Sequence, residues 1–445
     1  MIKTTPAYTK AFDQLNTAQH TAVSTTQGPV MVVAGPGTGK TSLLTTRIAY
    51  ILQREELQVG PENILCLTFT DAAAGNMRRR LVDMIGEPGA RVGVYTYHAF
   101  ANEALERIPR LSHLREEMEP ASALESRRIV REILGDQPLE SPLRKLHGRL
   151  YSEVSRMEEL FQTIKTHYIN PETSRPDPQL LIEKAQAQLK DLDNDESLFY
   201  KRGSKDGKRK AGDPKPKYFS TKSRLEKLIA AARCFGRYVE KLEQAGLYDF
   251  ADMINWVNIE FKENPDFLAD FQERYQYFLV DEYQDTNGSQ NELLFSLLTP
   301  AFGDENPRPN VLIVGDDDQG IYRFQGADIG NMEAFVSRYP ELELVVLTEN
   351  YRSSQPILDY ASRVITGNAD RIIYNEQLRE RYPDLSKELV AKGPANTPDA
   401  PAPEIVGYEN AAQEALALAD RVKALLNKGV QPSEIAILYT KHAYG

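Results

Sequence analysis

The chain has 445 residues, of which 41% are hydrophobic and 26% are charged, and its formal net charge is −11. This composition excludes a fibrous or disordered protein and suffices for two or three folded domains, because one hydrophobic core rarely grows beyond ~250–300 residues. The acidic charge argues against a protein that coats nucleic acid with its whole surface, but it leaves a local basic groove open.

Cysteine usage and the lack of targeting segments indicate where the protein works. Only Cys66 and Cys234 are present, and neither has a metal-ligand neighbour, so a disulfide framework is not expected. No apolar run approaches the ~18 residues of a membrane span, and the N-terminus lacks the apolar stretch of a signal peptide. We therefore expect a cytoplasmic protein without a membrane partner.

The first chemical signal is the run Val30–Thr41, VMVVAGPGTGKT, in which an apolar strand enters a glycine-rich turn. Such a turn points backbone N–H groups at phosphates, while Lys40 would reach their outer oxygens and the Thr41 hydroxyl would ligate Mg²⁺. Ala34 replaces the first glycine of the usual pattern. A glycine-rich turn without a ligand is the alternative interpretation. The predicted nucleotide-binding residues here are Ala34, Gly35, Pro36, Gly37, Thr38, Gly39, Lys40, Thr41 and Ser42.

Short apolar runs recur along the chain, and segments with helical spacing separate several of them. Because buried parallel strands read as continuous apolar runs joined by helices, the pattern predicts an α/β fold with a doubly wound parallel sheet. Helices are expected over Thr41–Leu52 and Asp71–Ile85. The expected strands are Val30–Ala34, Ile64–Phe69, Val92–Tyr95, Tyr277–Val280, Val311–Val314 and Leu342–Leu347.

From Asn102 to about Asp270 the strand signals vanish and helical spacing dominates, which predicts a helical domain inserted into the α/β one. Inside it lies the basic tract Lys201–Lys217, with eight lysines or arginines against Asp206 and Asp213. Such a tract is either a solvated loop tip or a contact to nucleic-acid phosphates, and the sequence leaves both interpretations open.

Two adjacent carboxylates follow the next apolar strand, in Phe278–Asp285, FLVDEYQD. In phosphate-binding enzymes such a pair holds Mg²⁺, here through Asp281, and places a carboxylate beside the attacking water, here Glu282. An N-cap or a simple turn is the structural alternative. The phosphate-binding turn upstream favours the catalytic interpretation.

A third polar turn follows Val311–Val314 and contains Asp316, Asp317, Asp318 and Gln319. Three consecutive aspartates repel one another, so the turn requires hydrogen bonds or cations. The Gln319 amide is suited to orienting a water or a terminal phosphate. Phe324 offers a ring to a nucleobase, and core packing is its alternative role.

A second α/β region is expected after Asn350. Beyond a proline-rich loop we expect a strand over Glu404–Tyr408, a helix over Ala411–Asn427 and a strand over Glu434–Tyr439. One strand pair and one helix are too little for a closed domain, so we expect this region to be incomplete.

These motifs, in this order, resemble the UvrD/Rep/PcrA group of superfamily 1 DNA helicases across essentially the whole chain. The segments that carry the resemblance are LNTAQ (Leu15–Gln19), AGPGTGKT, LTFTDAAAGNM (Leu67–Met77), VYTYHAF (Val94–Phe100), YDFADM (Tyr248–Met253), LVDEYQDTN, VGDDDQGIYRFQGA and LTENYRSS (Leu347–Ser354). The resemblance implies a RecA-like P-loop NTPase fold with an inserted helical domain and a partial second RecA-like domain.

The resemblance also implies roles at the nucleotide. Gln19 would read the adenine edge, Tyr351 would stack on adenine, and Arg352 would reach the γ-phosphate from the second lobe. Gln319 would sense the same phosphate. The implied cofactors are ATP and Mg²⁺, with Thr41 and Asp281 as metal ligands. The implied catalytic residues are Lys40, Asp281, Glu282, Gln319 and Arg352.

On the DNA side, the resemblance places six residues along a single-stranded track, where ring stacking tolerates any base. They are Phe69, Thr70, Thr96, Tyr97, His98 and Phe324. This sequence departs from the family pattern at Asp71 and Ala72, where Asn and Lys are usual, and at Phe324 and Gln325, where Trp and Arg are usual. We expect weaker DNA contacts on this face.

The resulting hypothesis is an ATP-dependent DNA helicase or translocase with 3′-to-5′ polarity that acts on single-stranded DNA and on single-strand/double-strand junctions. The predicted divisions are 1–103 with 268–345 for the first motor domain, 104–267 for the helical insert and 346–445 for the partial second motor domain. The family's later motifs have no counterpart, so we expect an N-terminal fragment whose turnover is impaired. The alternatives are an ATP-switched DNA-binding module and the motor half of a helicase-nuclease.

Overall fold

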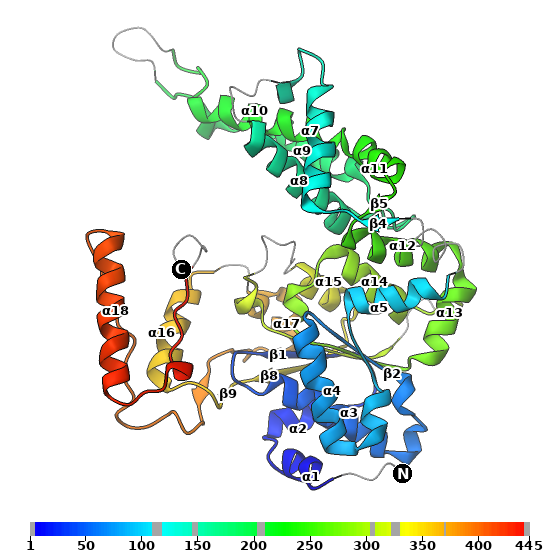
Figure 1. Ribbon diagram of the computed structural model, residues 1–445, viewed down its shortest axis with the longest axis vertical. Coiled ribbons are helices and arrows are strands. Elements are labelled where there is room, and N and C mark those ends of the chain that lie inside the picture. Colours follow the sequence, from blue (N-terminus) through cyan, green and yellow to red (C-terminus); the bar gives the residue numbers. More distant parts are fainter. Residues whose placement is uncertain are drawn as a thin grey trace.

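A six-stranded parallel sheet forms the centre of the structure (Figure 1). The computed structural model describes residues 5–108, 118–144, 150–202, 210–302, 308–321, 330–368 and 371–439. The strands lie in the order β3-β2-β6-β7-β1-β8, and all neighbouring pairs are parallel. They are β1 (Val30–Ala34), β2 (Ile64–Thr68), β3 (Gly93–Thr96), β6 (Tyr277–Val280), β7 (Asn310–Gly315) and β8 (Glu343–Leu347). All six expected strands are confirmed, and their ends shift by one residue at most.

The sheet is buried on both faces because helices cover each of them. Successive residues of a strand point to opposite faces, so Val32 belongs to one hydrophobic cluster and Val33 to the other. The first layer contains α1 (Pro6–Asp13), α2 (Thr17–Ser24), α3 (Lys40–Gln53) and α4 (Asp71–Ile85). The second contains α5 (Tyr97–Glu106), α12 (Phe250–Glu263), α13 (Pro265–Arg274), α14 (Gly288–Leu298) and α15 (Gly330–Arg338). The expected doubly wound α/β fold of the RecA-like class is confirmed.

A helical arm rises from one end of the sheet (Figure 1). Its helices are α7 (Ala123–Gly135), α8 (Leu150–His167), α9 (Pro178–Leu192), α10 (Pro216–Ala232) and α11 (Phe235–Gln244). They share a hydrophobic cluster of their own, built around Phe161, Tyr238 and Ile133. The short parallel strands β4 (Glu119–Pro120) and β5 (Leu247–Tyr248) were not expected, and they pair where the arm joins the body.

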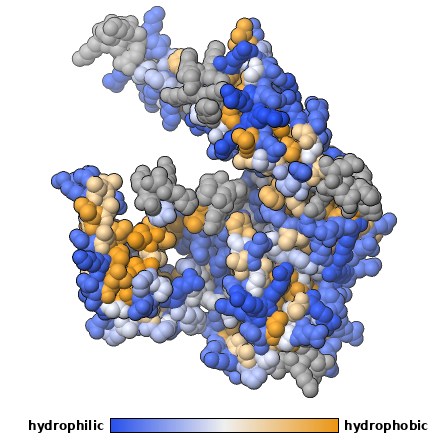
Figure 2. Space-filling model, viewed as in Figure 1, coloured by the Kyte–Doolittle hydropathy of each residue, from blue (hydrophilic) through white to orange (hydrophobic). Residues whose placement is uncertain are grey.

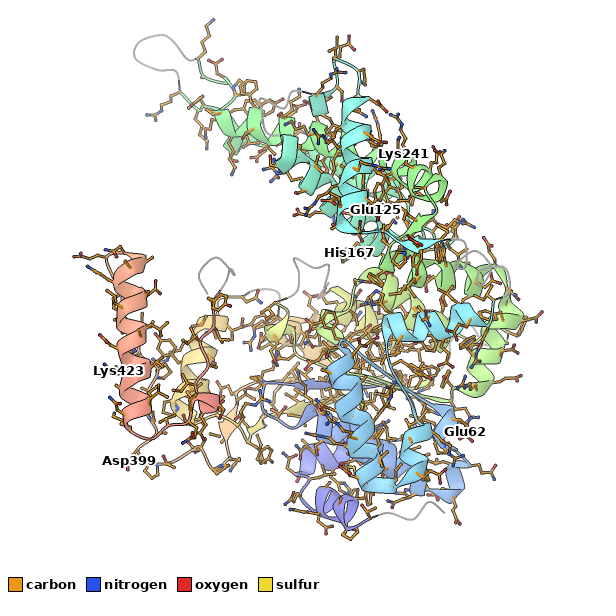
Figure 3. The ribbon with its side chains drawn as sticks, viewed as in Figure 1. Glu62, Glu125, His167, Lys241, Asp399 and Lys423 are labelled. Atoms are coloured by element: carbon orange, nitrogen blue, oxygen red, sulfur yellow. The ribbon has the colours of Figure 1, made fainter. Side chains whose placement is uncertain are left out.

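A buried ion cluster fixes the base of this arm. The Lys165 ammonium lies 2.7 Å from carboxylate oxygens of both Asp249 and Asp252, and only 1% of its side chain is exposed. Asp249 also caps the N-terminus of α12 through two backbone N–H groups. His167, at the end of α8, lies at the same junction, whereas Glu125 and Lys241 lie further along the arm (Figure 3). The cluster therefore ties α8 of the arm to α12 of the body.

The C-terminal region differs from the expectation in its strands. The structure contains α16 (Gln355–Ile365), α17 (Glu376–Arg381) and α18 (Ala411–Asn427), and a short parallel pair of β9 (Glu349–Asn350) with β10 (Val390–Ala391). The predicted helix Ala411–Asn427 is confirmed. The predicted strands Glu404–Tyr408 and Glu434–Tyr439 are wrong: neither segment pairs with another strand among the described residues, and Ile405 and Leu438 are 80% and 95% exposed. An apolar run becomes a strand only where a neighbour satisfies its backbone and covers one face.

Within the described ranges, none of the helices is both long enough and apolar enough to cross a membrane.

Candidate nucleotide and DNA sites

Most of the predicted site residues lie where five adjacent strands end, in the spatial order β3-β2-β6-β7-β1. Gln19 instead lies on α2, and Tyr351 and Arg352 follow β8 and β9. Because all five strands are parallel, their carboxyl ends open at the same edge of the sheet, where ligands of open α/β sheets bind. The fold therefore brings together motifs that are about 300 positions apart in the chain, such as those of Gln19 and Gln319.

The phosphate turn, Ala34–Thr41, has the local geometry that its glycines permit. Gly37 and Gly39 have φ of 73° and 87°, in the left-handed region that favours glycine. The Thr38 hydroxyl donates to the carbonyl oxygen of Gly35 at 2.8 Å, which closes the turn. Helix α3 begins at Lys40, so its first N–H groups and positive dipole end face the turn.

Gln19 is buried against this turn. Its Nε2 donates to the carbonyl oxygen of Thr38 at 2.9 Å, and its Oε1 accepts from the backbone N–H of Asn16 at 3.0 Å. The Asn16 amide in turn donates to the Tyr351 hydroxyl at 3.1 Å. The structure thus brings Gln19 and Tyr351, both predicted to bind the base, to the same side of the phosphate turn.

Lys40 forms an ion pair with Glu282, with 2.5 Å between Nζ and Oε2. Glu282 has φ of 49°, an uncommon value for a residue other than glycine, and such backbone strain tends to occur at functional sites. The Lys40 side chain is 11% exposed, but that of Glu282 is 35% exposed. The pair therefore borders open space, and the site is not closed by it.

Burial disfavours the ionised form of the Asp281 and Asp285 carboxyl groups. Burial, followed by the nearby charge of Glu282, raises the pKa of both to about 6. Among the described residues, Asp285 Oδ1 and Thr68 Oγ1 are buried without a hydrogen-bond partner. Buried oxygens of this kind favour a hard cation such as Mg²⁺ or its bound waters.

Asp281, Glu282 and Asp285 line a common cavity of about 460 Å³. This volume lies in the range of small-molecule sites. Of the predicted residues it contains Thr41, Asp281, Glu282 and Gln319 from the nucleotide set, and Phe69 and Thr70 from the DNA set. The full lining is Thr41, Thr68, Phe69, Thr70, Ala73, Asp281, Glu282, Gln284, Asp285, Asp318, Gln319 and Ile321.

The segment Asn350–Arg352 sits directly on the phosphate turn. The Tyr351 N–H donates to the Gly37 carbonyl oxygen at 2.9 Å, and the Asn350 side-chain amide donates to the Pro36 carbonyl oxygen. A Cβ added to Gly37 would meet the Arg352 Cβ at 2.6 Å, so only glycine permits this approach. Arg352 itself is exposed. Its backbone therefore lies next to the phosphate turn, and contact of its side chain with a phosphate stays a prediction.

The expected DNA residues divide into an exposed and a buried group. Thr70 and His98 are exposed and Phe69 is partly exposed. Thr96 and Thr70 each accept a helix N-terminal N–H at 3.2 Å, so both hydroxyls cap the helices that follow β3 and β2. Tyr97 is only 2% exposed and packs in the core beneath the sheet. Because the first turn of α5 directs its ring inward, the prediction that Tyr97 lines a surface track is not supported.

The exposed ring beside His98 was missed by the sequence analysis. Phe250, the first residue of α12, is 63% exposed and meets the His98 ring edge-on with 6.0 Å between centroids. Surrounding protein atoms partly desolvate His98 and lower its pKa. Phe324 lies outside the described residues, as does part of the basic tract Lys201–Lys217. The described end of this tract, 210–217, leads into the start of α10 at the outer end of the arm (Figure 1).

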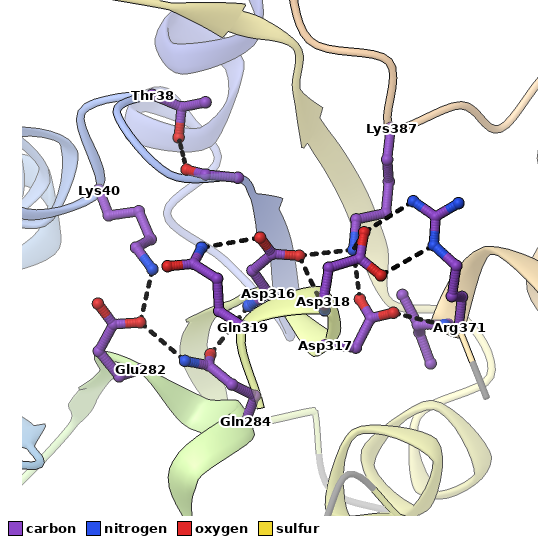
Figure 4. Close-up of polar contacts among 12 residues, drawn as sticks. Thr38, Lys40, Glu282, Gln284, Asp316, Asp317, Asp318, Gln319, Arg371 and Lys387 are labelled. Carbon is purple, nitrogen blue, oxygen red and sulfur yellow. Dashed lines mark hydrogen bonds and ion pairs between the residues drawn. The ribbon is translucent and has the colours of Figure 1, made fainter. Parts of the chain in front are cut away.

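Three polar residues near the cavity were also missed. Gln284 donates from Nε2 to Glu282 Oε2 at 2.9 Å, and its place in the FLVDEYQD run was a usable signal. Lys387 and Arg371 bind the three aspartates of the turn after β7 (Figure 4). The expectation that this turn needs cations is confirmed, but no motif pointed to these two residues.

Comparison with known proteins agrees with these features. Residues 15–340 match the family model described as the UvrD/REP helicase N-terminal domain. The chain is 29% identical over 359 residues to the ATP-dependent DNA helicase PcrA of Staphylococcus aureus (strain Mu50 / ATCC 700699), covering 81% of this chain and 41% of that protein. It is 30% identical over 357 residues to PcrA of Staphylococcus epidermidis (strain ATCC 12228 / FDA PCI 1200), covering 80% and 40%. The chain therefore spans about two fifths of the length of these relatives.

Proposed function

Because the chain belongs to the UvrD/REP helicase N-terminal domain family, we propose that it is the ATP-driven motor part of a DNA helicase or translocase. The whole protein would couple ATP hydrolysis to movement along single-stranded DNA and to unwinding at single-strand/double-strand junctions, with 3′-to-5′ polarity. Two findings support the proposal: the similar proteins are named ATP-dependent DNA helicases, and residues 15–340 match the helicase family model.

The observation that carries the proposal is the cavity in which Thr41, Asp281, Glu282 and Gln319 meet. These groups come from three separate segments of the chain and have the chemistry of a site for a metal-bound triphosphate. The ion pair of Lys40 with Glu282 fits the same interpretation, because an incoming phosphate would offer Lys40 an alternative anionic partner. Glu282 would then be free to accept a proton from water.

Mg²⁺ fits the oxygen donors at this site. Thr41 and Asp281 would hold the ion, and the unpartnered oxygens of Thr68 and Asp285 would accept hydrogen bonds from its waters. When bound, the ion would neutralise charge on the phosphates. Gln319 would orient the water or the terminal phosphate, and Arg352 would approach from the segment seated on the phosphate turn.

Recognition of the base is proposed for the other side of the turn. Tyr351 is 40% exposed, and its hydroxyl is held by Glu349 at 2.6 Å and by Asn16 at 3.1 Å. Held in this way, the ring is suited to stacking on adenine, while Gln19 keeps one amide hydrogen for the base edge. Nucleotide binding would therefore link the N-terminal helices to the segment after β8.

For DNA we propose a track across the same edge of the sheet, built from Phe69, Thr70, His98 and Phe250. The exposed rings suit stacking with any base, and Thr70 suits a phosphate contact. Tyr97 is left out of this proposal because it is buried. Whether Phe324 and the basic tract contribute stays a prediction.

We also propose the predicted division into a first motor domain, a helical insert and a partial second motor domain, with boundaries near 103 and 345. The boundary predicted at 267 moves to near Leu247 in this proposal, because α12 packs against the sheet while the arm's own cluster ends at Leu247. Opening and closing of the two motor parts around ATP would move the DNA. A cytoplasmic location is proposed as well, on the grounds that both cysteines are free and buried.

The test is ATP turnover by this chain with and without single-stranded DNA. We expect DNA to stimulate turnover and Lys40→Ala to abolish both turnover and nucleotide binding, because Lys40 is the cation of the phosphate turn. Lys10→Ala, on the surface of α1, is the matched control and should leave both unchanged. Nucleotide binding without DNA-stimulated turnover, both in this chain and in a protein of its relatives' length, would favour an ATP-switched DNA-binding module instead. Absence of nucleotide binding would refute the proposal.

A further inference from the structure

The turn after β7 concentrates negative charge in the interior. Asp316 and Asp317 are 1% and 2% exposed, Asp318 is partly buried, and carboxylate oxygens of all three lie within 4.8 Å of one another. Adjacent buried carboxylates remain ionised only when cations or donors lie close to them. The cation that neutralises them therefore controls the shape of the turn.

That cation is Lys387, which lies 71 positions after Asp316 in the chain. Lys387 Nζ lies 2.5 Å from Asp316, 2.7 Å from Asp317 and 2.9 Å from Asp318, and its side chain is 5% exposed. Arg371 binds Asp318 with two parallel hydrogen bonds, of 2.8 Å and 2.7 Å. Both residues belong to the region after β9, so this region is clamped onto the turn.

The turn after β7 also positions a residue of the proposed phosphate site. Asp316 Oδ2 accepts from Gln319 Nε2 at 2.7 Å, while Asp316 Oδ1 binds Lys387 (Figure 4). One carboxylate therefore links Lys387 to Gln319. Held by one amide hydrogen, Gln319 keeps its carbonyl oxygen and its other amide hydrogen for the cavity that it lines.

A second path leads from the same turn to the phosphate turn. The Asp316 N–H donates to Gln284 Oε1 at 2.8 Å, and Gln284 Nε2 donates to Glu282 Oε2 at 2.9 Å. Glu282 Oε2 is also the partner of Lys40. An uninterrupted series of polar contacts thus runs from Lys387 to Lys40 (Figure 4).

We propose that Lys387 is a positioning residue of the phosphate site, which fixes Asp316 and thereby holds the Gln319 amide where it distinguishes ATP from ADP. The inference rests on the proposed function, because it assigns Gln319 to the terminal phosphate. In this proposal Lys387 does not contact the terminal phosphate, and it affects recognition of that phosphate only through Asp316 and Gln319. Without the ammonium, three carboxylates would share one guanidinium, and their repulsion would release Asp316 from Gln319.

The experiment measures the affinities of this chain for ADP and for a slowly hydrolysed ATP analogue such as ATPγS, both with Mg²⁺. We expect Lys387→Met to weaken ATPγS binding about tenfold, the loss expected when a hydrogen bond to a charged group is removed. Binding of ADP should change less than about twofold, as for a remote surface substitution. Lys387→Arg should restore discrimination, since it keeps the charge. Lys392→Met, exposed on the same segment, is the control for loss of a cation.

A double-mutant cycle with Gln319→Ala separates positioning from mere stability. If Lys387 acts through Gln319, Lys387→Met should cause no further loss of ATPγS affinity in the Gln319→Ala background. Asp316→Asn serves as a second variant, because it leaves Lys387 paired with Asp317 and Asp318 and should show the same selective loss even if Lys387→Met fails to fold. Additive losses, or equal weakening of ADP and ATPγS, would overturn the inference.

The two proposals fail in different ways. If wild-type protein does not bind nucleotide, or binds it equally well after Lys40→Ala, the proposed function is refuted whatever Lys387 does. If wild-type binding requires Lys40 but Lys387→Met and Asp316→Asn leave the preference for ATPγS intact, only the role of Lys387 is refuted.

Discussion

At the scale of single residues, Asp281 of the candidate site lowers the stability of the fold when its carboxylate is ionised. Asp281 is 5% exposed, and burial raises its pKa to about 6. In an unfolded chain the pKa of an aspartate is about 3.9. The folded state therefore holds the proton more tightly, so stability from this group is present at low pH and is lost as pH rises through about 6. A buried anion of this kind costs free energy until a cation joins it.

This imbalance predicts that Asp281→Asn stabilises the protein at pH 7 while it removes Mg²⁺-dependent nucleotide binding. A pKa shift of about two units corresponds to an increase of at most ~3 kcal/mol in the free energy of unfolding. The gain should shrink at pH 5, where Asp281 itself is protonated. Urea unfolding at both pH values measures this gain, and the control Asp191→Asn, at an exposed position of α9, should change stability by less than about 0.5 kcal/mol. A loss of stability at pH 7 would contradict this account.

At the scale of elements, the junction between arm and body depends on one buried cation. Lys165 of α8 binds Asp249 and Asp252 at the start of α12, and burial raises the pKa of Asp252 to about 6. Lys165→Met would leave two carboxylates buried without their partner, which costs about 3–5 kcal/mol. We expect urea unfolding to show this loss and Asp252→Asn to recover part of it in the double variant. Lys184→Met, exposed on α9, is the control. If Lys165→Met were as stable as the control Lys184→Met, the junction would not need the charge of Lys165.

The elements also show how far the sequence could predict the structure. The six strands of the sheet were predictable because each is an apolar run buried on both faces, and the phosphate turn because glycine spacing dictates its backbone. Strands at Glu404–Tyr408 and Glu434–Tyr439 were predicted from equally apolar runs, yet pairing depends on a partner that local sequence does not reveal. The contacts of Lys387 and Arg371 could not be predicted from the sequence for a similar reason. Their partners lie 53 to 71 positions away in the chain, and long-range ion pairs leave no periodic signal.

Tyr97 illustrates a limit of inference by motif. Its neighbour Thr96 is buried and caps α5, and His98 faces solvent, but a helix turns each successive side chain by about 100°, which directs Tyr97 into the core. A motif therefore identifies the loop that approaches a ligand, whereas the direction of each side chain follows from the helix that begins there. The exposed ring of Phe250, from a distant segment, occupies the position beside His98 instead.

At the scale of the whole molecule, the sheet with its helices is well buried, but the region after β9 is not. No residue of α18 is buried, and apolar side chains gather over α16 and α18 (Figure 2). Val364 of α16 is 74% exposed and Leu416 of α18 is 69% exposed. Contiguous apolar surface of this kind is unusual on a monomeric protein and favours association or binding of apolar probes.

We therefore predict that this chain binds an apolar dye such as ANS under native conditions and associates as its concentration rises. Replacing Val364 and Leu416 together with lysine should remove most of the dye fluorescence and shift sedimentation toward the monomer, because both charges fall within the apolar surface. Leu124→Lys is the matched control: Leu124 is 77% exposed but stands on α7 of the arm, away from this surface. Equal dye binding by wild type and the double variant would show that the apolar surface is covered in solution.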